Sequence, residues 1–175
     1  SRNEPVATAV AVDDRARQLQ LLCIASFASM AAMRACDPML VVLSAEFGSS
    51  LGGASKVVSA YAVTYGVLQL FYGPLGDRIG KLQVVRWASL GCAVACALVA
   101  LAPTLGLMVG ARALMGAAAA GIIPLAMAWI GDTVAYGERQ ETLARLLGAI
   151  VIGLVAGQWL GAWVTDLFGW RWVFW

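Results

Sequence analysis

The sequence contains no histidine and little charge, and both shortages narrow its possible functions. Without His, imidazole-based catalysis and His-ligated metal sites are excluded. Charged residues make up 13% of the 175 residues, about half the share of a typical soluble domain. The net charge of +2 is too small to indicate a nucleic acid as a partner. A phosphate-binding loop of the G-x-x-x-x-G-K-S/T type is also missing, so ATP binding of that kind is not predicted.

Long apolar runs take the place of charge. Apolar residues make up 61% of the chain, and its mean hydropathy is +0.81. A helix that crosses a bilayer needs about 20 mostly apolar residues, whereas barrel strands alternate over about 10. The sequence therefore predicts an all-α membrane protein with five transmembrane helices and the start of a sixth at Trp172. The five predicted helices lie near Leu19–Leu43, Val57–Leu75, Val84–Leu101, Leu105–Ile130 and Leu146–Val164.

The polar segment 1–18 is predicted to be a loose cytoplasmic tail, which leaves 19–175 as an incomplete transmembrane domain. Short loops rich in Lys and Arg favour the cytoplasmic side. With the N-terminus inside, most basic residues fall on inside segments and few on outside segments. The inside set is Arg2, Arg15, Arg17, Arg78, Lys81, Arg86, Arg139 and Arg145, and the outside set is Lys56 and Arg171. This asymmetry predicts a cytoplasmic N-terminus.

The cysteines lie in apolar runs, and Cys92 and Cys96 are spaced to share one helical face. Such a pair could bind a metal, but no further ligand type stands nearby. Packing of small apolar side chains is the favoured interpretation. The sequence thus predicts no metal and no cofactor.

Nine residues rich in glycine and charge, Gly73–Lys81, separate the second and third apolar runs, and this pattern predicts a polar loop. The segment resembles the signature loop between the second and third helices of the major facilitator superfamily, a family of secondary transporters. The matching residues are Gly73, Asp77, Arg78, Gly80 and Lys81.

In this family the loop belongs to a charge cluster that helps hold one transport state. Asp77 and Lys81 have the spacing of a helical ion pair, and Asp132 resembles another member of the cluster. The resemblance implies a conformational gate. A solvated turn that merely follows the positive-inside rule is the alternative.

Arg112 to Gly116 resembles the R-x-x-x-G motif of the family's fourth helix. A charge inside a span costs about 2.5–3.5 kcal/mol, so Arg112 should face protein or water and have a partner. Counted at about 1.5 Å per residue, Asp37 and Arg112 lie at the same depth. In the family that the chain resembles, the first and fourth helices both line the central cavity, so the resemblance implies that the two could pair across it. Arg34 can also pair with Asp37 at i,i+3. Pro38 should bend the first helix there.

The resulting hypothesis is that Asp37 exchanges protons, Arg112 modulates its proton affinity and Arg34 helps to recognise substrate. A static charge cluster that positions helices is the alternative. In the fifth helix, Gly153, Gly157 and Gly161 form a stripe suited to close packing. This stripe resembles the family's antiporter signature, but Gln158 stands where that signature has Pro. Gln158 is expected to be a polar cavity group, and a helix–helix hydrogen bond is the alternative.

The resemblance covers most of residues 19–175 and implies the N-terminal half of a twelve-helix transporter. The closing segment around Trp170 is similar to drug-export branches of the family. The expected function is proton-coupled efflux of small organic molecules by alternating access, and not an enzyme activity. Expected partners are substrate, protons, the lipid bilayer and a missing C-terminal half or completing chain, in the plasma (bacterial inner) membrane. A non-transporting scaffold or assembly subunit is the alternative.

Overall fold

The computed structural model describes residues 4–175, with side chains from residue 14 onward. Most of these residues are helical and none forms a strand, which confirms the predicted all-α class for this part of the chain. The elements are α1 (Glu4–Arg34), η1 (Asp37–Met39), α2 (Leu40–Glu46), α3 (Leu51–Ile79), α4 (Lys81–Ala100), α5 (Leu105–Ala119), α6 (Ile122–Thr133), α7 (Tyr136–Phe168) and η2 (Trp170–Phe174).

Four segments are long and apolar enough to cross a membrane: Asp14–Glu46, Lys81–Ala100, Leu105–Thr133 and Tyr136–Phe168. They correspond to the predicted first, third, fourth and fifth spans. The predicted second span lies within α3, a long helix that is not among the four; its tyrosines and Gln69 lower its hydropathy. The predicted start of a sixth helix is the short 3-10 turn η2. The structure thus supports fewer spans than the sequence predicts.

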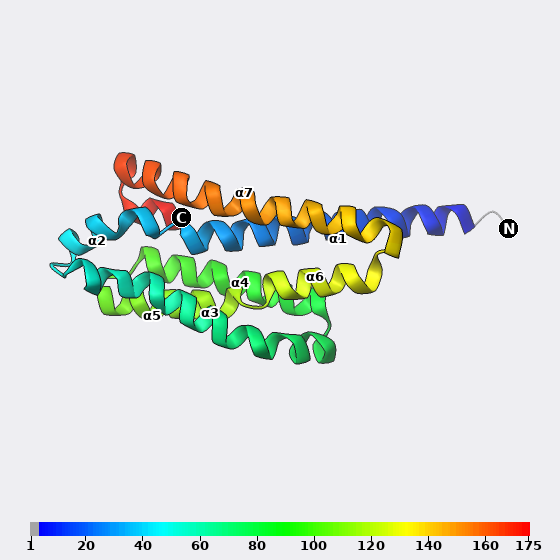
Figure 1. Ribbon diagram of the computed structural model, residues 1–175, viewed down its shortest axis with the longest axis horizontal. Coiled ribbons are helices and arrows are strands. Elements are labelled where there is room, and N and C mark those ends of the chain that lie inside the picture. The colour runs from blue at the N-terminus through cyan, green and yellow to red at the C-terminus, as the bar shows by residue number, and fades with distance from the viewer. Residues whose placement is uncertain (1–3) are drawn as a thin grey trace.

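The helices lie side by side along one axis (Figure 1), with α1 and α7 in one layer and α3 to α6 in the other. Their buried side chains form two clusters, one toward each end of the bundle. A short connection joins α4 to α5, which pack closely as an antiparallel pair. We call the end where α3 meets α4 and α6 meets α7 the charged end.

The contact between α1 and α7 depends on the glycine stripe. Gly153, Gly157 and Gly161 are buried, and a Cβ atom on each would collide with backbone atoms of α1 or of Ala35, the residue that follows it. At Gly161 the clash would be with the carbonyl oxygen of Ala35, at 2.6 Å. Small residues let two helix backbones approach closely in a membrane. The predicted packing role of this stripe is confirmed.

The start of the chain differs from the prediction of a loose tail. The first helix begins at Glu4, so residues 4–18 are helical, and residues 1–3 lie outside the described part. The segment contains several alanines, which have the highest helix propensity. It therefore extends the apolar helix that follows it. Which side of the membrane it occupies stays a prediction.

Two of the predicted spans are interrupted. The first breaks between Arg34 and Asp37, next to Pro38, as the missing N–H of proline predicts. The fourth, predicted as one helix, breaks at Ala120 and Gly121. Here Pro124 is the cause, because it cannot donate to the carbonyl of Ala120 and its ring crowds that group. At the same break, the Tyr72 hydroxyl of α3 donates to the carbonyl of Ala117 in the last turn of α5, 2.9 Å away.

Candidate functional site

The break in the first span holds the predicted acid–base pair. Arg34 is the last residue of α1, and Asp37 opens η1. The Arg34 Nη1 atom lies 2.8 Å from Asp37 Oδ2, so the i,i+3 ion pair is formed. The Asp37 side chain is 19% exposed and that of Arg34 is 43% exposed. The Asp37 carboxyl group is therefore mostly buried but still accessible to solvent.

Arg112 lies at the same break, but it does not form the predicted ion pair with Asp37. Its side chain is fully buried. The guanidinium donates from Nη1 to the carbonyl of Ala32 at 2.8 Å, from Nη2 to that of Met33 at 3.1 Å, and from Nε to that of Val57 at 3.4 Å. Backbone oxygens thus take the place of the expected carboxylate.

The break itself explains why Arg112 prefers carbonyls. Ala32 and Met33 stand in the last turn of α1, and their usual donors would be the N–H groups of residues 36 and 37, beyond the helix end. A cation at this end also interacts favourably with the helix dipole. The ring of Tyr61 lies 4.4 Å from the guanidinium carbon and adds a cation–π contact. Arg112 therefore caps α1 from a neighbouring helix.

The glycine of the same motif has a separate packing role. A Cβ atom on Gly116 would collide with the carbonyl of Tyr61 and the hydroxyl of Thr64 on α3. Thr64 uses that hydroxyl to donate to the carbonyl of Ala113 at 2.8 Å. Glycine at position 116 therefore lets α5 lie close enough to α3 for Arg112 to reach the break.

The second candidate site is the charge cluster at the charged end. Lys81 Nζ lies 3.0 Å from Asp77 Oδ1 and 2.6 Å from Asp132 Oδ2. The predicted Asp77–Lys81 pair is confirmed, and Asp132 joins it. The cluster connects the end of α3, the start of α4 and the end of α6. Arg78 is exposed and forms no ion pair among residues 14–175.

The backbone around this cluster is not the predicted polar loop. Helix α3 continues through Gly73 and Pro74 to Ile79, and only Gly80 leaves the helix. Its φ of +103° explains why this position is glycine. A Cβ atom on Gly76 would collide with Leu125 of α6, so the sequence analysis missed a packing position inside the motif.

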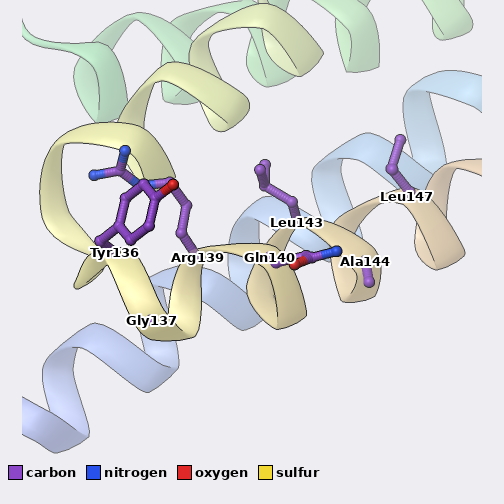
Figure 2. A pocket seen from close by; sticks show the side chains of 7 residues that line it. All are labelled: Tyr136, Gly137, Arg139, Gln140, Leu143, Ala144 and Leu147. Carbon is purple, nitrogen blue, oxygen red and sulfur yellow. The ribbon is translucent and has the colours of Figure 1, made fainter.

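The remaining predicted site residue lies apart from both sites. Gln158 is exposed on α7, and its side chain makes no hydrogen bond within residues 14–175. A hollow of about 630 Å³ lies at the start of α7 (Figure 2), where Arg139 stacks 5.9 Å from the ring of Tyr136. This hollow contains none of the predicted site residues. Apart from Gln158, the predicted site residues thus lie at the helix break and at the charged end.

Comparison with known proteins places these features in a family. The model of the Major Facilitator Superfamily matches residues 22–175. This chain belongs to the major facilitator superfamily. The match covers both the helix break and the charge cluster.

Relatives in this superfamily are much longer than the chain. It is 31% identical over 138 residues to an uncharacterized MFS-type transporter of Mycobacterium tuberculosis, Rv1877, with 79% of the chain and 20% of the relative covered. It is 22% identical over 153 residues to the multidrug export protein EmrB of Escherichia coli, with coverages of 87% and 30%. It is 28% identical over 138 residues to quinidine resistance protein 1 of Saccharomyces cerevisiae, with coverages of 79% and 24%. The chain thus spans a fifth to under a third of these relatives.

Proposed function

We propose that this chain is the N-terminal part of a proton-coupled exporter of small organic molecules that works by alternating access. Membership of the superfamily supports transport, and the names of two relatives, a multidrug export protein and a quinidine resistance protein, support efflux. The observation that carries the proposal is the Arg34–Asp37 ion pair inside a broken membrane span. Ionisable groups at such a depth are costly and usually serve function.

In the proposed mechanism, Asp37 carries the proton. Protonation cancels the carboxylate charge and weakens its bond to Arg34, whose half-exposed guanidinium becomes free to contact substrate. Loss of the proton restores the pair and displaces the substrate. Arg112 holds the end of α1 in place throughout, because its donors are bound to backbone carbonyls. Its role is to position the break.

Alternating access needs a contact that opens and closes, and we assign this role to the Lys81 cluster. Its three members come from different helices, so their separation would let the charged end open. Gly73, Gly80 and Arg78 complete this gate in the proposal. Gln158, exposed on α7, is proposed to line the transport path once the rest of the protein is present.

The proposed partners are a small organic substrate, protons, the lipid bilayer and the remainder of a longer protein or a completing chain. The length of the relatives supports a missing part. We place the protein in the plasma membrane, the inner membrane of a bacterium, with its N-terminus in the cytoplasm. These relatives do not favour the alternative of a non-transporting scaffold.

Replacement of Asp37 by Asn tests the proposal. The complete protein is expressed in a drug-sensitive bacterial host, and export of ethidium and of quinidine is measured after energisation. Asp37→Asn should abolish export without reducing the amount of protein in the membrane. Asp166→Asn is the matched control, since Asp166 is exposed in the last turn of α7 and forms no ion pair in the described chain. Undiminished export by Asp37→Asn would refute the proton-carrying role.

A further inference from the structure

A cluster of polar and aromatic side chains, which we call the Glu46 clasp, lies opposite the charged end, where α2 and α7 end (Figure 1). It consists of Glu46, the last residue of α2, and of Trp170 and Arg171 in η2. Trp170 Nε1 donates to Glu46 Oε2 at 2.5 Å, and Arg171 Nη1 donates to Glu46 Oε1 at 2.5 Å. Each carboxylate oxygen of Glu46 therefore accepts one hydrogen bond from η2.

The arginine extends the clasp to a third part of the chain. Arg171 Nη2 donates to the carbonyl of Ala102, between α4 and α5, at 3.4 Å. Its guanidinium carbon lies 4.3 Å from the ring of Trp170, which adds a cation–π contact. The clasp thus joins the end of α2, the connection between α4 and α5, and the turn that follows α7.

The side chain of Trp170 anchors the clasp in the core. It is 2% exposed, and its ring centroid lies 6.0 Å from that of Phe47. Gly169 ends α7 and turns the chain with a φ of +90°, which favours glycine. An ion pair between partly exposed side chains contributes little by itself, but a buried indole N–H needs an acceptor. Glu46 is therefore held by more than a surface ion pair.

Helix α2 lies between the clasp and the helix break that holds Asp37. Of its seven residues, Leu43 alone is buried, so its own packing holds it weakly. Arg112 caps α1, on the other side of the break. Asp37 belongs to the α2 side, because η1 leads directly into α2. The position of Asp37 relative to Arg34 therefore depends on where α2 is held.

We propose that the Glu46 clasp positions Asp37 by holding the far end of α2. Glu46, Trp170 and Arg171 are then positioning residues for the proton step, an inference that rests on the proposed function of Asp37 as the proton carrier. The segment is tied at both ends, by the 2.8 Å ion pair of Asp37 with Arg34 and by the clasp at Glu46. If the clasp opens, α2 can shift and the ion pair at the break loses its fixed geometry.

Glu46→Gln in the complete protein tests whether the clasp holds α2. An amide has one acceptor oxygen, so it cannot serve both donors. Hydrogen–deuterium exchange in α2 should become roughly tenfold faster, because one hydrogen bond to a charged group is lost. Arg171→Gln should give a similar increase, and the double variant little more, because both substitutions remove the same contact. Glu141→Gln is the matched control, since it breaks an ion pair within α7, near its start, and should leave α2 unchanged.

Ethidium transport by the same variants tests the effect on Asp37. Energised export should fall severalfold in Glu46→Gln, whereas downhill equilibration of ethidium, which needs no proton carrier, should stay as in wild-type protein. Unchanged exchange in α2, or additive effects of the two substitutions, would overturn the clasp. Faster exchange with undiminished energised export would overturn the positioning role. If Asp37→Asn itself exports normally, the proposed function fails, and the exchange measurement still decides whether the clasp holds α2.

Discussion

Replacement of Arg112 by lysine should destabilise the protein although it preserves the positive charge. Arg112 donates to two carbonyls of α1 at 2.8 and 3.1 Å through different nitrogen atoms. A lysine ammonium has one nitrogen and no planar fork, so it cannot occupy both positions. At least one hydrogen bond from a charged donor is lost, at about 1.5–3 kcal/mol. An ammonium is also more strongly hydrated than a guanidinium, so burial of lysine at this position adds a desolvation cost to the lost hydrogen bond.

Thermal unfolding in detergent, followed by tryptophan fluorescence, measures this effect. For a protein of this size, about 1.5–3 kcal/mol lowers Tm by roughly 3–12 °C. The same loss should appear in a background that also carries Asp37→Asn, because Arg112 contacts backbone rather than the carboxylate. An unchanged Tm in Arg112→Lys would refute the capping role. If Arg112→Lys no longer lowers Tm in the Asp37→Asn background, the result would instead support the Asp37–Arg112 ion pair that the sequence predicts.

Three further predictions follow from packing and from the charge cluster. Gly157→Ala should lower Tm by several degrees because its Cβ would push into the backbone of α1, whereas Gly148→Ala, with open space around it, should not lower Tm. Tyr72→Phe should cost about 1–3 kcal/mol in chemical unfolding because it leaves a carbonyl at the second helix break without a donor, while Tyr136→Phe, at a side chain that is 89% exposed, should be neutral. Lys81→Met should speed amide hydrogen exchange at the start of α4 because it removes the ion pairs with Asp77 and Asp132. Unchanged exchange there would argue that these ion pairs do not hold the helices together.

Much of the fold could be predicted from apolar length and proline. Runs of about 20 apolar residues predict membrane-spanning helices because the backbone polar groups must form hydrogen bonds with one another inside the bilayer. Pro38 marks a helix break because a missing N–H has a fixed consequence. Pro124 carries the same signal, but it stands inside a continuous apolar run, and that run favoured a single helix. Helix α3 shows that apolar length alone is not decisive. The helix is long, but its tyrosines and glutamine lower its hydropathy.

The candidate sites divide in the same way. The pairs Arg34–Asp37 and Asp77–Lys81 could be predicted because both partners lie within one turn of sequence. The partners of Arg112 could not be predicted from the sequence. Every residue has a backbone carbonyl, and a carbonyl is free to accept a bond from a side chain only where a helix ends. A sequence-based search for charge partners looks for carboxylates and passes over backbone oxygens.

The most direct test of the central claim is substrate-driven proton movement through the complete protein in sealed liposomes. A pH-sensitive dye inside the vesicles reports protons while ethidium is supplied on one side. The proposed mechanism predicts that protons move opposite to ethidium with wild-type protein and that this movement is absent with Asp37→Asn. Ethidium transport that continues without proton movement, or proton movement that persists in Asp37→Asn, would contradict the assignment of Asp37 as the proton carrier.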